Sequence, residues 1–326
     1  MDAATIARQG GAAELAQALR SSRADTLATF AAWRQARPDL AVPQRGDLNP
    51  PLWELGHIAW FADHWIARNP QRHLGATADP LAPRRPAARA NADALYDSSN
   101  VPQDSRWGLP LPDAENTVLD MAAQLDRSLQ RLNGMADDDH DRLYFHRLTL
   151  LHEDMHHEAA LYMAQALGVT VHDPRWQASP LPDPPPALHL PAQTGRLGSD
   201  GDTGFAFDNE LSAHDQTVAA TTIDAQVTRW AEYLPAVEAG AVPMPRYLRR
   251  QDGKWQHWRH GKWSTLDPRL AACHLSQPEA QAWCRWAGRR LPTEVEWEFA
   301  ARSLGAAFAW GEVWEWTSSQ IGRAHV

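Results

Sequence analysis

The chain has 326 residues, 44% of them hydrophobic and 22% charged, a balance typical of a globular protein large enough for two domains. Its net charge of −9 disfavours nucleic acid as a partner, because phosphate binding needs a basic surface. The sequence shows no leader peptide, no apolar stretch long enough to cross a bilayer, and only two cysteines, Cys273 and Cys284. We therefore expect a cytoplasmic protein with reduced thiols and no membrane partner.

The first half of the chain is predicted to be helical. Apolar residues recur at helical spacing in four segments, and prolines, acidic residues and glycines mark several of their ends. The predicted helices cover residues 12–37, 50–68, 114–132 and 142–167, and a long excursion over residues 69–113 separates the second from the third. Four helices with one long crossover are typical of a four-helix bundle.

A proline-rich segment over residues 173–192 is predicted to be a semi-rigid linker. After it the sequence has short apolar segments, Gly-Asp turns and many of the chain's 16 tryptophans. Helices are expected there at residues 277–287 and 293–301. This change of texture predicts an α+β protein with a helical domain over residues 1–172 and a mixed domain over residues 193–320.

The segment around His152 carries the most informative pattern, H-E-x-x-H. His152 and His156 are four residues apart on a predicted helix, so they lie on the same face and both imidazoles can bind one metal ion. In zinc proteases this pattern gives two ligands and a general-base glutamate, which here would be Glu153. The pattern alone leaves both the metal and the chemistry open.

Two helical segments carry the candidate metal ligands: Pro50-Pro-Leu-Trp-Glu-Leu-Gly-His57 and His152-Glu-Asp-Met-His156-His-Glu. Three later segments are Phe205-Ala-Phe-Asp-Asn-Glu210, Cys284-Arg-Trp-Ala-Gly-Arg-Arg-Leu-Pro-Thr-Glu-Val-Glu-Trp-Glu-Phe-Ala-Ala301 and Trp310-Gly-Glu-Val-Trp-Glu-Trp-Thr317. The later set resembles the C-type-lectin-like domain of formylglycine-generating and sulfatase-modifying proteins. Together, the segments resemble the nonheme-iron sulfoxide synthases, the ergothioneine-type enzymes that join a chalcogen to the imidazole of hercynine. The resemblance spans nearly the whole chain and implies a DinB-like four-helix bundle followed by the lectin-like domain.

The resemblance implies a mononuclear Fe(II) centre. Its ligands would be His57, His152 and His156, and Glu153 would orient an imidazole N–H from outside the ligand set. The expected substrates are hercynine, O2 and a chalcogen donor. The remaining histidines of these helices, His64, His146 and His157, are expected to be structural or exposed.

Within this family the chain is most similar to the selenoneine synthases, which use a selenosugar as donor. The segments that carry this likeness are Leu48-Asn-Pro-Pro-Leu-Trp-Glu-Leu-Gly-His-Ile58, Leu95-Tyr-Asp-Ser-Ser99 and His152-Glu-Asp-Met-His-His-Glu-Ala-Ala-Leu-Tyr-Met-Ala-Gln-Ala166. Relatives that use thiol donors with carboxylates present more than one arginine after the second helix, whereas residues 97–107 offer only Arg106. A neutral sugar needs no pair of guanidinium groups.

Three residues are expected to contact the substrates: Arg106, Met155 and Trp314. The tryptophans Trp310, Trp314 and Trp316 are expected to lie mainly in the core of the lectin-like domain. The alternative is a cation–π contact with the trimethylammonium group of hercynine.

The carboxyl end of the sequence stops short of the family pattern. Relatives continue after Trp314-Glu-Trp-Thr317 with a stretch that carries an active-site tyrosine and hercynine-binding residues. We therefore expect the 193–320 domain to be incomplete and the proton donor to lie beyond the chain, so no catalytic residue is assigned. Residues 321–326 match the translation of a common sequencing adapter, and we expect them to be a non-native tail.

Three other functions are considered beside the selenoneine synthase-like one. The first is an ergothioneine-type sulfoxide synthase with a thiol donor. The second is an H-E-x-x-H zinc hydrolase, and the third is a non-catalytic DinB-like metal-binding module, which a truncated chain would favour. A monomer is expected in each case.

Overall fold

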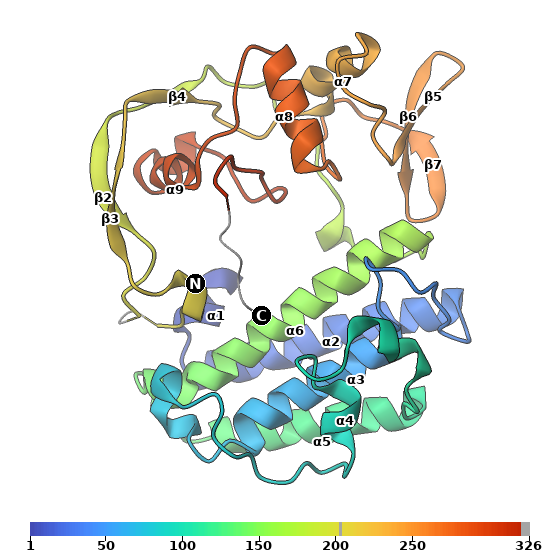
Figure 1. Cartoon of the computed structure of the whole chain (residues 1–326), viewed down its shortest axis with the longest axis vertical. Helices are drawn as coiled ribbons and strands as arrows, with labels where there is room; N and C mark the ends of the chain where they lie inside the picture. The colour runs from blue at the N-terminus through green and yellow to red at the C-terminus, as the bar shows by residue number, and fades with distance from the viewer. Residues whose placement is uncertain (202–203, 321–326) are drawn as a thin grey trace. The chain divides into compact units, whose positions relative to one another are not determined.

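The computed structural model describes residues 1–201 and 204–320, so the predicted tail over residues 321–326 lies outside the described residues (Figure 1). The chain divides into two compact units. The first comprises Met1–Val171 with Asp200–Leu211, and the second comprises His172–Ser199 with the residues from Ser212 on. Helices dominate the first unit and antiparallel strands occur in the second, which confirms the α+β class. In the part of the chain that the structure describes, no helix is both long and apolar enough to span a membrane.

The first unit is helical. Its α-helices are α1 (Ala3–Gln9), α2 (Ala12–Ala36), α3 (Pro51–Ala62), α4 (Ala92–Tyr96), α5 (Ala114–Leu132) and α6 (His140–Leu167). A π-helical turn at Asp63–Ala67 continues α3, and 3₁₀ turns occupy Arg72–Thr77, Gln103–Gly108 and Asp208–Glu210. Helix α2 packs along α6, and α3 lies against both α5 and α6 (Figure 1). All four predicted helices are present and pack together, and their DinB-like identity stays a prediction.

The ends of these helices follow from their capping residues. The Asp113 carboxylate accepts a hydrogen bond from the Asn116 backbone N–H at the start of α5, and Asp139 accepts from Arg142 at the start of α6. Helix α6 ends at Gly168, whose φ of 72° lies in the left-handed region that glycine tolerates best. Local sequence chemistry therefore fixes the length of the helix that carries His152 and His156.

The excursion over residues 69–113 packs against α3. The Trp53 indole N–H donates to the Leu95 carbonyl at 2.8 Å, and the two side chains share a buried cluster with Trp60, Ala92 and Tyr96. This packing places the short helix α4 beside the helix that bears His57. The excursion thus forms one wall of the histidine site.

Residues 200–211 pack with the first unit although strands of the second unit flank them. The Arg8 guanidinium donates to both carboxylate oxygens of Glu210, at 2.8 and 2.9 Å, and the Arg8 carbonyl accepts from the Phe205 N–H at 2.8 Å. Phe205 is buried and contacts the ring of Tyr144 on α6. The Phe205–Glu210 motif therefore has a packing role against α1 and α6.

The second unit mixes short helices with antiparallel strands. Its helices are α7 (Trp230–Glu238), α8 (Gln277–Trp286) and α9 (Glu294–Ser303), with 3₁₀ turns at Pro174–Trp176 and Gly305–Ala307. Its strands are β1 (Leu188–Leu190), β2 (Gln193–Leu197), β3 (His214–Val218), β4 (Thr221–Ile223), β5 (Leu248–Gln251), β6 (Lys254–Arg259) and β7 (Lys262–Thr265). They pair as β1–β4, β2–β3 and β5–β6–β7. Strand β1 falls inside the segment that was predicted as a linker.

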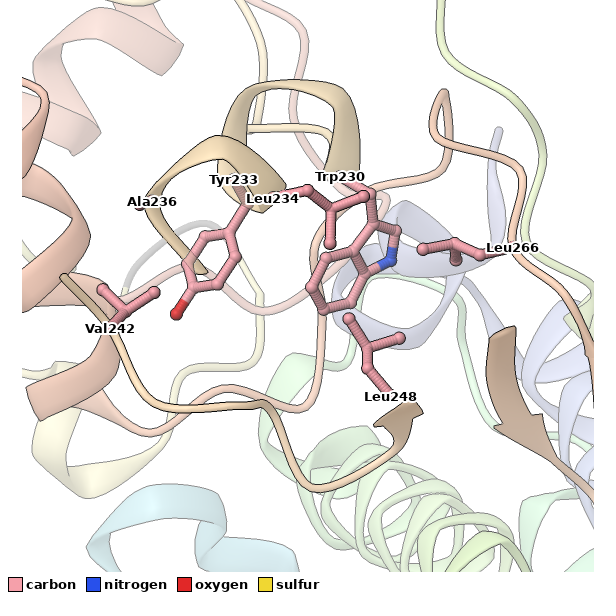
Figure 2. Close-up of a cluster of buried hydrophobic side chains, with 7 residues drawn as sticks. All are labelled: Trp230, Tyr233, Leu234, Ala236, Val242, Leu248 and Leu266. Carbon is pink, nitrogen blue, oxygen red and sulfur yellow. The ribbon is translucent and has the colours of Figure 1, made fainter. Parts of the chain in front are cut away.

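The core of the second unit contains two apolar clusters. One surrounds α7, where the side chains of Leu234, Leu248 and Leu266 lie around the Trp230 ring (Figure 2). Tyr233, Ala236 and Val242 complete this cluster. The other gathers Leu190, Val218, Phe299, Ala300 and Phe308, so that α9 packs against the β1–β4 and β2–β3 strands. Both expected helices, at 277–287 and 293–301, are present as α8 and α9.

The prediction that three late tryptophans form core is wrong. Trp310, Trp314 and Trp316 are 58%, 87% and 48% exposed. They lie in a segment after residue 308 that has no helix or strand to turn one face inward. The Trp316 indole N–H donates to the Leu275 carbonyl at 2.9 Å, and the Trp310 ring meets the Trp297 ring edge-on, with centroids 5.5 Å apart. The cysteines are free thiols as expected, with Cys284 buried and Cys273 half-buried.

Candidate metal centre

His57 is held in the middle of α3. The prolines at residues 50 and 51 suit the first turn of a helix, and ten of the twelve residues of α3 are buried. The His57 ring stacks on the Trp53 indole, with centroids 4.7 Å apart and planes 9° from parallel. Its Nδ1–H donates to the Tyr96 carbonyl at 2.8 Å, which leaves the Nε2 lone pair free to bind a cation.

His152 and His156 face His57 from α6. Their ring centroids lie 5.0 and 4.8 Å from that of His57. The two Nε2 atoms of the α6 pair are 3.2 Å apart, and the Nδ1–H of His156 donates to the Glu54 carboxylate at 2.5 Å. Phe61 stacks on the His152 ring, with centroids 3.5 Å apart and planes 3° from parallel. Helices α3 and α6 thus bring all three predicted ligands together.

The three imidazoles form a suitable donor set for a metal ion. One nitrogen from each ring lies within 4.8 Å of the others. Burial lowers the pKa of His57 to about 4 and that of His152 well below its usual value, so both rings are neutral near pH 7. Two nitrogens bound at a right angle about 2.1 Å from one ion lie about 3.0 Å apart, close to the 3.2 Å between His152 and His156. Lone pairs that face each other at this distance fit a shared cation.

The environment of the site is mostly apolar. Phe61, Trp53 and Trp60 surround the rings, and burial is the main cause of the lowered pKa values. Among residues 1–201 and 204–320, no second group of three His, Cys, Asp or Glu side chains meets the same geometry. The histidine cluster is therefore the candidate functional site of the described chain.

Glu153 does not have the predicted orienting role. Both its carboxylate oxygens accept hydrogen bonds from Arg23, at 2.7 and 3.1 Å, and both side chains are almost completely buried. The physical reason is helical geometry, because Glu153 lies about 100° around α6 from His152 and so faces α2. The carboxylate that contacts a predicted ligand is that of Glu54, which accepts from His156. It was missed, although it stands three residues before His57 and hence on the same face of α3.

Arg106 lies near the site but is already engaged. Its guanidinium stacks 3.7 Å over the Trp53 ring, and its Nη1 donates to the Asn49 side-chain oxygen at 3.0 Å. Since Trp53 stacks in turn on His57, the three groups form a layered arrangement. The Gln103 amide donates to the backbone carbonyls of residues 45 and 48, so it serves to anchor the loop.

The other two predicted substrate residues differ in their surroundings. Met155 is 49% exposed on α6, next to a ligand position. Trp314 belongs to the other unit, where it lines a cavity of about 920 Å³ together with Trp283, Trp316 and Cys273. Met155 and Arg106 thus share a unit with the three histidines, and Trp314 does not.

The neighbouring histidines, expected to be structural or exposed, are buried or half-buried in the first unit. His157 is buried and its Nε2 lies 2.9 Å from the Thr29 hydroxyl of α2. His64 accepts from the Arg84 guanidinium at 3.1 Å, and His146 is buried in the bundle. None of them belongs to the group of converging nitrogens.

Comparisons with known proteins show what the chain is similar to. Residues 187–325 match the model of the sulfatase-modifying factor enzyme 1-like domain. The hercynine oxygenase of Mycolicibacterium smegmatis is 26% identical in an alignment that covers 84% of this chain and 76% of the relative. The hercynine oxygenase of Mycolicibacterium thermoresistibile is also 26% identical, and the alignment covers 84% of this chain and 73% of the relative. The formylglycine-generating enzyme of Streptomyces coelicolor is 45% identical over 62 residues, 17% of this chain and 20% of the relative. The chain is therefore similar to hercynine oxygenases over most of its length and to formylglycine-generating enzymes in a part of its second half.

Proposed function

We propose that this protein is an O2-dependent nonheme Fe(II) enzyme that joins a chalcogen to C2 of the hercynine imidazole, with His57, His152 and His156 holding the iron. The observation that carries the proposal is the convergence of three imidazole nitrogens from two helices within 4.8 Å of one another, with His57 and His152 buried and His156 half-buried. The likeness to hercynine oxygenases supports the choice of hercynine and of oxidative chemistry. Three imidazole ligands also suit iron and leave positions for substrates.

The side chains around the histidines prepare the site for this chemistry. His57, His152 and His156 would hold a ferrous ion, which would supply electrons to O2 and a binding position for the donor. The imidazoles contribute no negative charge, so the ligand set favours an anionic donor such as a selenolate or thiolate. The stacked Trp53 and Phe61 rings hold two of the imidazoles in place and exclude water from their faces.

The proposed overall reaction balances with one molecule of O2. The C2–H bond of hercynine and the Se–H or S–H bond of the donor break, and a carbon–chalcogen bond forms. Forming that bond releases two electrons, and oxidation of the chalcogen to its oxide releases two more. One oxygen atom ends on the chalcogen, and the other leaves as water with the two released hydrogens. No described residue is assigned as the proton donor.

We further propose a selenosugar as the donor. Arg106 is the single arginine of the loop over residues 97–107, and its guanidinium already stacks on Trp53 and bonds to Asn49. Gln103 is committed to the backbone. These engagements leave the loop without a pair of free cationic groups for a donor that carries carboxylates, which favours a neutral sugar. A thiol donor is the alternative for the same fold.

The environment of Glu153 argues against the zinc hydrolase alternative. A general base must reach a water molecule at the metal, but both oxygens of Glu153 are bound to buried Arg23 on the far side of the helix. A non-catalytic metal-binding module would share the three ligands and differ only in lacking turnover.

The decisive experiment uses the protein expressed from its complete gene, purified without oxygen and loaded with Fe(II). We expect O2-dependent consumption of hercynine and the selenosugar. Mass spectrometry should detect a product in which hercynine is joined to the selenium of the donor. The variant His57→Ala should bind no iron and form no product. Turnover with γ-glutamylcysteine instead would identify the thiol alternative, and iron binding without turnover of either donor would support the non-catalytic module. Zinc-dependent peptide cleavage would establish the hydrolase.

A further inference from the structure

Glu54 is a buried carboxylate that the proposed function leaves without a role. It lies on α3, one turn before His57, and is 4% exposed. Its Oε2 accepts the hydrogen bond from the His156 Nδ1–H at 2.5 Å. Its Oε1 is buried and has no hydrogen-bond partner among the described residues. The bond to His156 is therefore the one hydrogen bond that this carboxylate makes in the described structure.

A buried carboxylate with a single hydrogen bond depends strongly on that bond, because transfer from water into an apolar site is costly without polar partners. The nearby cation, Arg106, offers no replacement, since its guanidinium is stacked on Trp53 and bonded to Asn49. The pair of Glu54 and His156 must therefore keep a proton on Nδ1. This arrangement directs the Nε2 lone pair of His156 toward His152, 3.2 Å away.

The two oriented histidines differ in the charge of their acceptors. His57 donates to the neutral carbonyl of Tyr96, whereas His156 donates to a carboxylate. A carboxylate draws the shared proton more strongly and increases the electron density at the opposite nitrogen, which makes the ring a stronger metal ligand. The same helix, α3, thus supplies one ligand directly and controls a second one on α6.

We propose that Glu54 is the positioning residue of the metal centre, which fixes the tautomer and orientation of His156 and strengthens it as a ligand. This inference rests on the proposed function, because it requires the three histidines to hold a metal ion. Glu54 touches neither substrate nor metal, so it acts through His156 alone.

The test measures Co(II) binding to the metal-free full chain, because Co(II) reports its ligand field in its visible absorption. The variants are Glu54→Gln, which keeps size and an acceptor oxygen but removes the charge, and Glu54→Leu, which removes both. We expect affinity to fall about 10-fold in the first and up to about 100-fold in the second, the range known for partners of ligating histidines. The absorption bands of bound Co(II) should shift in both.

The matched control is Glu158→Gln, which removes one negative charge from an exposed position on α6 two residues after His156. It should bind Co(II) like the wild type and show the same spectrum. Thermal unfolding of each metal-free variant checks that the bundle is intact. Glu54→Gln keeps the test informative if Glu54→Leu does not fold.

The outcomes separate this inference from the proposed function. If the wild type binds Co(II) and both its affinity and its spectrum are unchanged in Glu54→Gln, the positioning role is wrong and the pair with His156 only stabilises the fold. If the wild type binds no Co(II), the proposed metal centre fails, and the role of Glu54 fails with it. Weaker binding with a shifted spectrum in Glu54→Gln alone, and not in Glu158→Gln, supports the inference.

Discussion

Replacing Glu153 by glutamine should destabilise the helical unit far more than it affects metal binding. Arg23 donates to Glu153 through Nε and Nη2, at 2.7 and 3.1 Å, and also to the Met121 carbonyl and the Gln124 side chain. The Arg23 and Glu153 side chains are 5% and 4% exposed. Loss of the carboxylate charge leaves a guanidinium buried without its counter-ion.

The size of this effect follows from the burial of the pair. Removing one partner of a buried ion pair costs about 3–5 kcal/mol. Glutamine keeps one acceptor oxygen for Arg23, so we expect the lower end of that range. For a unit of this size each kcal/mol lowers the melting temperature by roughly 2–4 °C, which gives a decrease of roughly 6–12 °C. The measurement is thermal unfolding of the metal-free protein, followed by circular dichroism at the helical band.

Two variants make the assignment specific. Arg23→Gln combined with Glu153→Gln leaves no unpaired charge, so it should be more stable than Glu153→Gln alone. Glu158→Gln, on the exposed side of the same helix, should have the same melting temperature as the wild type. A melting temperature of Glu153→Gln equal to that of the wild type would refute the buried-pair argument. Retained zinc with lost peptide cleavage would instead identify Glu153 as a general base.

Two further substitutions test the wall of the site and the second unit. In Gly56→Ala the added methyl group would lie 2.2 Å from the Tyr96 ring, so we expect a loss of about 1–3 kcal/mol in urea unfolding and weaker Co(II) binding, since the Tyr96 carbonyl orients His57. Normal binding and stability would show that the ring moves aside freely. The Arg290 guanidinium lowers the pKa of Glu296 from 4.5 to about 2, so this carboxylate stabilises the fold above about pH 4.5 and loses that effect as the pH falls toward 2. Glu296→Gln should therefore flatten the acid unfolding curve in this interval, and superimposable curves of tryptophan fluorescence would contradict the assignment.

Much of the helical unit could be predicted because its signals are local. Helix α5 spans Ala114–Leu132 as expected, since an aspartate caps its start and apolar residues keep its period. The π-helical turn at Asp63–Ala67 could not be predicted, because no proline or glycine marks it. The short helices of the 69–113 excursion were not predicted either, because they depend on packing against α3 more than on the helix propensity of their own residues.

The candidate site was predictable in its ligands and not in its supporting residues. The spacing of His152 and His156 fixes a shared face, and the family resemblance pointed to His57. The choice between Glu54 and Glu153 needed the direction in which each side chain points, which depends on how α3 and α6 are rotated about their axes. The exposed Trp314 shows the same limit, since an irregular segment has no period from which burial could be inferred.

Helix α3 is buried on every side, with only Leu52 and Phe61 partly accessible. Such a helix offers no position where a new side chain can be tried without disturbing neighbours. Substitutions are better tolerated in the loop over residues 97–107, which carries Arg106 and exposes most of its residues to solvent. Libraries of variants that aim to change the choice of substrate should therefore substitute residues of that loop and leave α3 intact.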